Sequence, residues 1–380
     1  MTVPGTRRRG LLLLTAVLAA LSFGSAAPAA SAQGPQAPRS FYGVIPIDNL
    51  SVSEINKLGA ANVGTLRQLV LWPQVEPQRD SYDWSYLDLL VGNAARNGIE
   101  ILPFLYGTPR WAGVKCGRLN KERCQRVPPL KPKKARRAWS DFLVDFVARY
   151  GPQGTFWAEN PSNPFLPISR VQCWNEPSSK TYWEPRPQPK AYGTLLKLCN
   201  KAVASADPSV KIVTAGLFPS PELGKEFRFV NYLDELFDVR GIGRHFDEAA
   251  FHPYARTIVR LKNQIRTMRK EMRQGGVGKK PLWVSELGWG SAPPVDNRPL
   301  IKGIEGQKTL LEQSFRMLTD SQARWKLAGV IWYSFRDPGF DYANCPFCSS
   351  SGLLEGNGAP KPAWFSLLQF TGGTDVPLSP

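Results

Sequence analysis

The chain has 380 residues, which fits one large α/β barrel with insertions as well as two smaller domains. It contains only two histidines, so a three-histidine zinc site is excluded and a Ser-His-Asp triad has few possible bases. The formal net charge of +17 attracts polyanions. Lys and Arg are scattered apart from residues 131–137, which begin a predicted helix, so we expect no nucleic-acid binding. An acidic or cell-wall-associated polymer would explain the charge, and so would simple colloidal solubility.

The amino terminus has the pattern of a secretory signal peptide. Three arginines at 7–9 precede an apolar run at 11–23 and a small-x-small cleavage pattern at 30–32. The run is too short and too rich in alanine for a convincing membrane span, and no later segment could span a bilayer. We therefore predict a signal peptide at 1–32 and a secreted protein, whose charge falls to +14 because the signal carries three arginines and no acid. An uncleaved amino-terminal anchor is the alternative.

From Phe41 onward, short apolar runs alternate with amphipathic stretches. The preceding residues 33–40 are rich in Pro, Ala and Gln without apolar periodicity, as in a flexible linker. The alternation predicts repeated βα units and a parallel sheet. Strands are predicted at 41–46, 63–69, 99–105, 167–174, 210–216, 247–251, 281–286 and 328–334.

Helical periodicity follows most of these strands. Eight strands with intervening helices predict an α/β fold, a (β/α)8 TIM barrel, as a single domain at 41–372 with a tail at 373–380. A doubly wound open sheet shares the alternation, but residues 43–48 lack the glycine-rich phosphate turn of that fold. Long connections follow most strands, so enlarged βα loops should shape a groove. Helices are predicted at 53–58, 86–97, 135–150, 189–205, 227–237, 258–273 and 306–323.

The six cysteines can form disulfides in an exported chain. Spacing suggests the local pairs Cys116 with Cys124 and Cys345 with Cys348. The remaining Cys173 and Cys199 flank a βα unit, where a strand-to-helix bridge and two buried free thiols are both open. Zinc binding by Cys345 and Cys348 is a weak alternative, because no second Cys or His pair lies nearby.

Two acids lie where a barrel enzyme needs them. Glu176 follows predicted strand four and Glu286 ends predicted strand seven. Glycoside cleavage uses two carboxyl groups, one to protonate the leaving oxygen and one to attack or to activate water. A single Glu at a strand end is more often a solvated loop charge or a helix cap. Here Asn175 and Pro177 flank the first acid, and Leu-Gly-Trp289 follows the second.

On these motifs the chain resembles the clan A glycoside hydrolases, above all families 5 and 39. Trp174-Asn-Glu-Pro177 is similar to the clan's acid/base motif at the end of strand four, and Ser285-Glu-Leu-Gly-Trp289 is similar to its nucleophile segment at the end of strand seven. Further matches run through nearly the whole chain after the signal, each at a predicted strand end: Thr65–Leu69, Trp72–Pro77, Pro109–Trp111, Phe251–Tyr254 and Trp332-Tyr-Ser.

The resemblance implies a role for each matching residue. Glu176 would be the acid/base and Glu286 the nucleophile. Arg67 and Tyr254 would hold Glu286 ionised and oriented, and Asn175 would contact the sugar 2-hydroxyl. His252 would line the pocket, with a hydrogen-bonding role rather than proton transfer, and we assign no function to His245.

Twelve tryptophans offer flat faces that cover sugar C–H groups well, although most should be core. Trp332, at the end of strand eight, would form a floor under the sugar next to the scissile bond. Trp111 and Trp289 are further candidates in loops.

The sequence therefore predicts a secreted, monomeric, retaining glycoside hydrolase that acts on a polysaccharide or oligosaccharide without cofactor or metal. An inverting barrel would separate its carboxyl groups further. A catalytically silent barrel that binds cell-wall glycan is the alternative from another class, since a fold alone does not prove activity.

Overall fold

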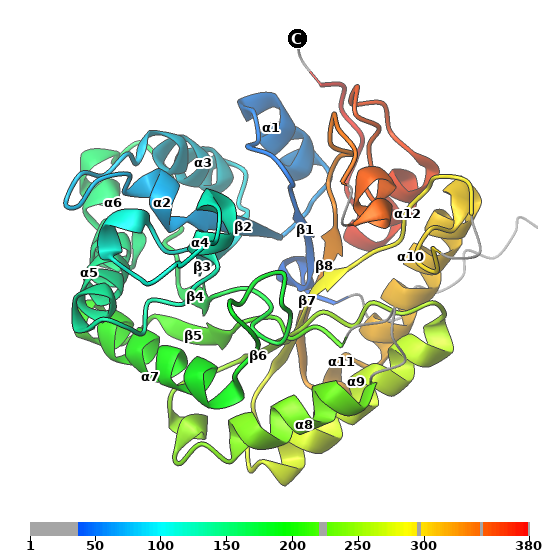
Figure 1. The fold of residues 1–380 in the computed structure, drawn as a ribbon. Coiled ribbons are helices and arrows are strands. Elements are labelled where there is room, and N and C mark those ends of the chain that lie inside the picture. Colours follow the sequence, from blue (N-terminus) through cyan, green and yellow to red (C-terminus); the bar gives the residue numbers. More distant parts are fainter. Residues whose placement is uncertain (1–36, 220–225, 295–297, 343–344, 379–380) are drawn as a thin grey trace, which may run out of the picture. The chain divides into compact units, whose positions relative to one another are not determined.

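The structure, a computed structural model, describes residues 37–219, 226–294, 298–342 and 345–378. Eight parallel strands lie at its centre in the order β5-β4-β3-β2-β1-β8-β7-β6. An isolated bridge between Val213 and Glu248 and a hydrogen bond from the Thr214 amide to the Glu248 carbonyl (3.0 Å) join the two ends of this order. The sheet is thus a nearly closed barrel (Figure 1). Its strands are β1 Tyr42–Ile45, β2 Thr65–Leu71, β3 Glu100–Tyr106, β4 Arg170–Cys173, β5 Lys211–Thr214, β6 Ala249–Phe251, β7 Leu282–Leu287 and β8 Leu327–Tyr333.

The strands carry apolar side chains on both faces because both faces are covered. Every residue of β1 and of β7 is buried. Such continuous burial is typical of parallel strands that have side chains filling the barrel on one face and helices on the other. All eight predicted strands are found, each within a few residues of its predicted bounds.

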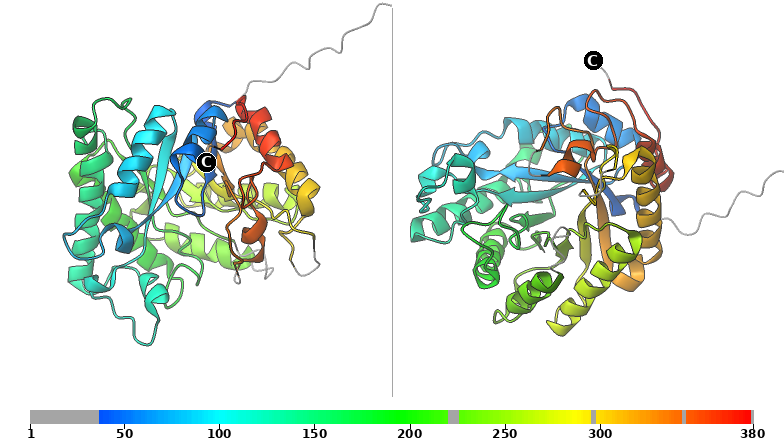
Figure 2. Two further views of the ribbon diagram at one scale, coloured as in Figure 1. Left: turned by 90° about the horizontal axis from the view of Figure 1, so that it is seen from above. Right: turned by 45° about the vertical axis from the view of Figure 1, so that its right-hand side comes forward.

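An outer layer of helices surrounds the strands (Figures 1 and 2). Each long helix turns an apolar stripe toward the barrel, as its periodicity predicts. The first of them begins with a capping box, in which Ser51 accepts from the Glu54 amide and Glu54 accepts from the Ser51 amide. The long helices are α1 Val52–Ala60, α3 Ser85–Arg96, α5 Lys133–Tyr150, α7 Pro189–Ala206, α8 Glu226–Phe237, α9 Ile258–Gln274, α10 Gly303–Asp320 and α12 Pro362–Thr371.

Short helices lie in the connections, and the sequence did not indicate them. They have three to five residues, which is too few for a periodic apolar pattern. One of them divides the helix predicted at 306–323, because the chain turns at Ser321 between α10 and α11. The short helices are α2 Trp72–Val75, α4 Lys121–Gln125, α6 Thr155–Glu159, α11 Gln322–Trp325, η1 Arg39–Phe41, η2 Arg110–Ala112, η3 Ile242–Arg244 and η4 Pro346–Ser350.

The two ends of the described chain lie against the barrel. The segment predicted as a signal peptide, and half of the predicted linker (residues 33–36), fall outside the described residues. Residues 373–378, predicted as a tail, contact α1: the Thr374 amide donates to the Ala60 carbonyl (2.9 Å), and Asp375 pairs with Lys57. No helix within the described ranges combines the length and the apolar character needed to cross a bilayer.

The cysteines lie as three pairs. Cys116–Cys124 and Cys345–Cys348 are the pairs that spacing suggested, and Cys173–Cys199 connects β4 to α7. Their Cα–Cα separations of 5.2, 5.3 and 6.5 Å all suit a disulfide. The Cys173–Cys199 pair links the residue immediately before Trp174 to α7.

Candidate active site

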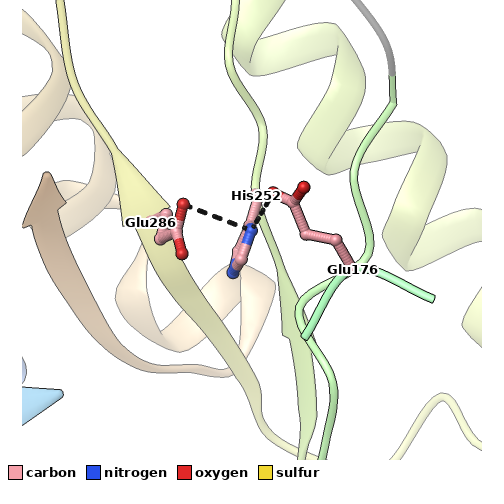
Figure 3. Close-up of side chains that lie close together, drawn as sticks. All are labelled: Glu176, His252 and Glu286. Atoms are coloured by element: carbon pink, nitrogen blue, oxygen red, sulfur yellow. Dashed lines mark hydrogen bonds and ion pairs between the residues drawn. The ribbon is translucent and has the colours of Figure 1, made fainter. Parts of the chain in front are cut away.

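The polar side chains at the carboxyl ends of the strands meet at one point. Glu176 follows β4, His252 follows β6 and Glu286 is the penultimate residue of β7. All three are buried, and one carboxylate oxygen of each Glu and the His252 Nδ1 lie within 4.8 Å of one another. Figure 3 shows His252 between the two carboxyl groups.

Glu286 is held by one cation and one phenol. The Arg67 Nη1 donates to Oε1 (2.6 Å), and the Tyr254 hydroxyl donates to Oε2 (2.8 Å). Both donors favour the ionised carboxylate and fix its plane. These are the two residues that the family resemblance assigned to this task.

The Arg67 side chain is held by packing and by hydrogen bonds. Its side chain is fully buried on β2, and its guanidinium lies 3.9 Å above the ring of Phe104 on β3. Nε donates to Gln172 Oε1 (2.8 Å) and Nη2 donates to Asn175 Oδ1 (2.9 Å). Three of its five N–H groups are used in these bonds, and because the guanidinium is planar it holds Glu286 and Asn175 in a set orientation.

Glu176 lies in a turn of unusual backbone geometry. Trp174 and Glu176 both have positive φ, 77° and 38°, a conformation that costs non-glycine residues about 1–3 kcal/mol and clusters at functional sites. The turn is held because the Trp174 amide donates to Leu105 (2.9 Å) and its indole donates to the Tyr182 carbonyl (2.8 Å). The strained turn directs the Glu176 carboxyl toward Glu286.

His252 connects the two carboxyl groups. Its Nδ1 lies 2.7 Å from Glu176 Oε1 and 3.5 Å from Glu286 Oε2. Burial lowers the pKa of His252 well below its ordinary value, and Arg67 lowers it further, so the ring is neutral. A neutral Nδ1 can accept from a protonated Glu176 or, in the other tautomer, donate to an ionised one. Gly216 gives the ring its space, since a Cβ there would lie 1.9 Å from Nε2.

The two carboxyl groups differ in their electrostatic surroundings. Burial raises the pKa of Glu176 well above its ordinary value, and the Glu286 charge raises it further. Burial also raises the pKa of Glu286, but Arg67 and the hydrogen bond from Tyr254 lower it. Glu286 is therefore the group that ionises first and Glu176 the group that keeps its proton.

Glu176, His252 and Glu286 are also the one set of three metal-ligand side chains that lie this close within the described ranges. The donor set fits a cation poorly. Both oxygens of Glu286 already accept hydrogen bonds, and the Arg67 guanidinium places a positive charge 2.6 Å from one of them. A carboxyl pair with a built-in cation suits proton transfer and nucleophilic attack better.

The three predicted tryptophans pack against other aromatic side chains and donate to backbone carbonyls. Trp332 is fully buried, with its ring 6.2 Å from Phe315 of α10 and its indole donating to the Ser351 carbonyl (3.1 Å). Trp289 packs beside it at 6.0 Å. Trp111 packs edge-on against Trp72, and its indole donates to the Glu76 carbonyl (2.9 Å). The prediction of a Trp332 floor is therefore corrected, because this residue points to the helix layer.

Tyr333 lies on the opposite face of β8 from Trp332. Side chains alternate along a strand, so the residue after Trp332 faces the barrel mouth. Its ring lies 6.4 Å from Tyr254, it is partly exposed, and burial and the charge of Glu286 raise the pKa of Tyr333 well above its ordinary value. The sequence analysis did not identify Gln172, which accepts from Arg67 inside the barrel. The alternation of side chains along β4 could have placed it on the inward face. Tyr182 had no such signal, because it lies in an irregular loop.

Neither a known family model nor a curated protein matches the sequence. Solved structures do match. A family 39 glycoside hydrolase from Bacteroides cellulosilyticus is 19% identical over 88% of this chain and 63% of its own, with a TM-score of 0.61. A monomeric β-xylosidase from Caulobacter crescentus is 17% identical over 88% and 68%, with a TM-score of 0.63. A GH5_18 protein from Streptomyces cattleya, solved in complex with Manb1-4GlcNAc, is 16% identical over 91% and 82%, with a TM-score of 0.60.

These similarities define the class of the fold. The chain is a (β/α)8 barrel whose structural neighbours are glycoside hydrolases of families 39 and 5. It spans less than two thirds of the Bacteroides protein and slightly more than two thirds of the Caulobacter protein.

Proposed function

We propose that this protein is a retaining glycoside hydrolase in which Glu286 is the nucleophile and Glu176 the acid/base. One observation carries the proposal: two buried carboxyl groups face each other across the barrel mouth, and only Glu286 is paired with a cation. The short separation favours retention, because retaining enzymes hold these groups about 5–5.5 Å apart and inverting enzymes about 6.5–9.5 Å.

The first step forms a covalent intermediate. A Glu286 oxygen attacks the anomeric carbon while the Glu176 proton passes to the glycosidic oxygen, whose bond to that carbon breaks. The leaving alcohol departs and the sugar remains as an ester of Glu286. Arg67 and Tyr254 orient the attacking carboxylate, and His252 orients the proton donor.

The second step releases the sugar. Once Glu286 is esterified its negative charge is gone, so the pKa of Glu176 falls and its carboxylate can take a proton from water. The water oxygen attacks the anomeric carbon, the ester bond breaks and Glu286 leaves as a carboxylate. Asn175 Oδ1 is used by Arg67, which leaves its amide to donate to a sugar hydroxyl.

We further propose that residues 1–32 direct export, which agrees with three cysteine pairs in an oxidising compartment. We also propose that the protein binds an anionic polymer, at a site other than the catalytic pair. A cavity of about 470 Å³ between α9 and α11 is lined by several cations, and α11 directly precedes the amino end of β8, opposite the site. Its basic residues are Arg266, Arg269, Lys270, Arg273 and Arg324.

Hydrolysis of nitrophenyl glycosides tests the function. The purified protein should release nitrophenol from at least one member of a panel of xyloside, mannoside, glucoside, galactoside and arabinoside, with either anomer, and EDTA should not change the rate. Binding of a polysaccharide without turnover of any panel member would instead support the silent barrel.

The pH dependence should be bell-shaped. We expect kcat/KM to fall at low pH as Glu286 gains a proton and can no longer attack, and at high pH as Glu176 loses the proton that it must donate. Because burial and the neighbouring carboxylate raise the pKa of Glu176, the alkaline limb should lie well above the ordinary range of a glutamate. In Glu176→Gln, measured on a dinitrophenyl glycoside that needs no protonation, the alkaline limb should vanish while the acid limb stays. An alkaline limb that persists would assign it to another group.

A further inference from the structure

An aromatic residue of the loop after β8 lies next to the nucleophile's hydrogen-bond partner. Phe347, in η4, has its ring centroid 5.2 Å from that of Tyr254 and 6.1 Å from that of Tyr333. Tyr254 is the residue whose hydroxyl donates to Glu286. The three rings therefore form one wall beside the Glu286 carboxylate.

The side chains at this wall differ in their exposure to solvent. Tyr254 is 3% exposed and Glu286 7%, whereas Phe347 and Tyr333 are both partly exposed. Phe347 and Tyr333 therefore keep some ring surface exposed, and both rings lie next to Tyr254, whose hydroxyl binds Glu286. Such surface next to reacting groups is typical of a ligand-binding site.

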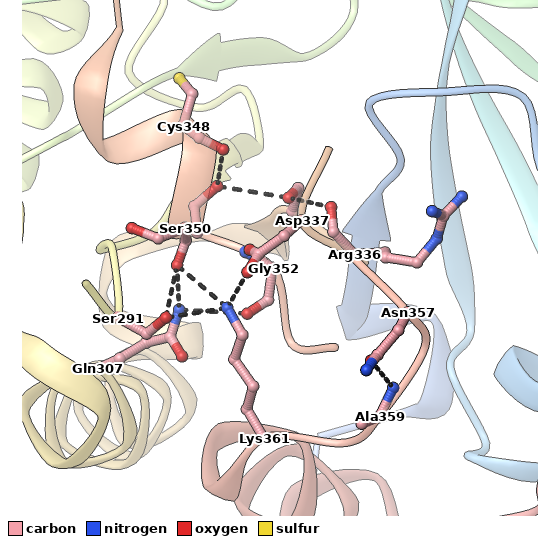
Figure 4. Close-up of polar contacts among 12 residues, drawn as sticks. Ser291, Gln307, Arg336, Asp337, Cys348, Ser350, Gly352, Asn357, Ala359 and Lys361 are labelled. Carbon is pink, nitrogen blue, oxygen red and sulfur yellow. Dashed lines mark hydrogen bonds and ion pairs between the residues drawn. The ribbon is translucent and has the colours of Figure 1, made fainter. Parts of the chain in front are cut away.

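A buried polar network holds η4 in place (Figure 4). The Ser350 carbonyl accepts from the Ser291 amide (2.8 Å), from Gln307 Nε2 (3.2 Å) and from Lys361 Nζ (3.3 Å). Lys361 is 1% exposed and pairs with Asp337 (2.5 Å). Because the network joins the β7 loop, α10 and the chain before α12 to η4, Phe347 lies on a fixed support.

Two local features bring η4 close to the strand that carries Glu286. The pair Cys345–Cys348 brackets Phe347. Gly290, four residues after Glu286, leaves room for the backbone of η4, since a Cβ there would lie 3.1 Å from the Phe347 carbonyl oxygen and 2.6 Å from Ser350 Oγ. The position of the Phe347 ring is therefore tied to that of Glu286.

The charges around the pair limit the kind of sugar. Arg67 is the cation that acts on both Glu176 and Glu286 within the described ranges, and three of its N–H groups already donate to Glu286, Asn175 and Gln172. A carboxylate on the reacting sugar would compete with Glu286 for Arg67, and it would face two acids. The aromatic wall offers only apolar and phenolic contacts.

We propose that Phe347 and Tyr333 form the wall of the subsite that holds the reacting sugar, with Phe347 packing against the apolar C–H face of an uncharged pyranose or furanose. This inference rests on the proposed glycosidase function. Phe347 touches the sugar equally before and during bond cleavage, so it sets affinity for the sugar more than the rate of the chemical step.

The test compares Phe347→Ala with Phe340→Ala on the neutral nitrophenyl glycoside that the wild type cleaves fastest. Phe340 belongs to the same loop but is 54% exposed, so it is the matched control. Loss of a ring that covers one sugar face should raise KM about tenfold, with kcat changed less than about threefold. Phe347→Tyr should restore KM, and all variants should keep the unfolding temperature and the pH profile of the wild type.

Each outcome has a separate meaning. A KM for Phe347→Ala within twofold of the wild type would overturn the aromatic wall. Nitrophenyl glucuronide and galacturonide should be cleaved at least about 100-fold more slowly than the best neutral glycoside, because a buried carboxylate would have to compete with Glu286 for Arg67; a uronide as the best substrate would overturn the uncharged subsite. If the wild type cleaves neither neutral nor acidic glycosides, the proposed function itself fails.

Discussion

Glu286→Gln is expected to lower kcat on the order of 10⁴-fold or more, about 5.5 kcal/mol of activation free energy. The amide keeps the shape of the side chain but cannot form the ester intermediate. Every substrate should be affected alike, whatever its leaving group, because every substrate must pass through the ester intermediate. Steady-state rates with a nitrophenyl and a dinitrophenyl glycoside measure this.

Stability and a matched control separate chemistry from folding. Glu286→Gln removes the charge that pairs with the buried Arg67, so its unfolding temperature should be measured alongside its rate. Glu271→Gln replaces another buried carboxyl, on α9 and away from the site, and should keep wild-type kinetics. A Glu286→Gln protein with wild-type activity would end the proposed mechanism.

Glu176→Gln should show the second-largest effect, and its size should depend on the leaving group. A proton donor contributes about 10²–10⁴-fold, so we expect a loss of about 10³ in kcat/KM for an alkyl glycoside that needs protonation. A dinitrophenyl glycoside should lose little in kcat/KM, because its leaving group departs as an anion. Hydrolysis of its glycosyl-enzyme should become slow, since no base activates water.

The difference between the rate losses of the two substrates is the decisive part of the prediction for Glu176→Gln. We expect a burst of dinitrophenol equal to one equivalent of enzyme, followed by slow turnover. Equal losses for both substrates would show that Glu176 acts in positioning and not in proton transfer. His252→Ala serves as the comparison, because it removes the partner of Glu176 and leaves the carboxyl in place.

The strand pattern predicted the fold well, and the reason is visible in β1 and β7. Their residues are all buried, so the sequence shows compact apolar runs that only a covered parallel sheet explains. Since the carboxyl ends of all strands meet at one edge, predicting the strands also predicted that residues at the ends of β4, β6 and β7 would come together. Glu176, His252 and Glu286 followed from this rule.

The side-chain direction within a strand end was harder to predict. Trp332 and Tyr333 are adjacent aromatics in one apolar run, and a shift of one residue exchanges the face toward the helices for the face toward the site. Nothing in the run itself gives the register. It follows instead from packing of Trp332 against Phe315 and Trp289.

Apart from two cysteine pairs, the structure of the loops could not be predicted from the sequence. The support of η4 depends on the buried Lys361–Asp337 pair and on Gln307, which come from three separate parts of the chain. No local sequence pattern at these residues indicates a buried network. The substrate-facing wall is built on such contacts, which explains why the catalytic pair was predictable from the sequence and the sugar-binding wall was not.

Trapping the covalent intermediate tests the central claim most directly. The enzyme would be incubated with the 2-deoxy-2-fluoro analogue of its best substrate, carrying a dinitrophenyl leaving group, and then digested and analysed by mass spectrometry. We expect one fluoroglycosyl group per chain, attached to Glu286 in the peptide that contains Trp283 and Trp289. A stable label on any other residue, or turnover with no covalent label at all, would contradict the assignment of Glu286 as the nucleophile.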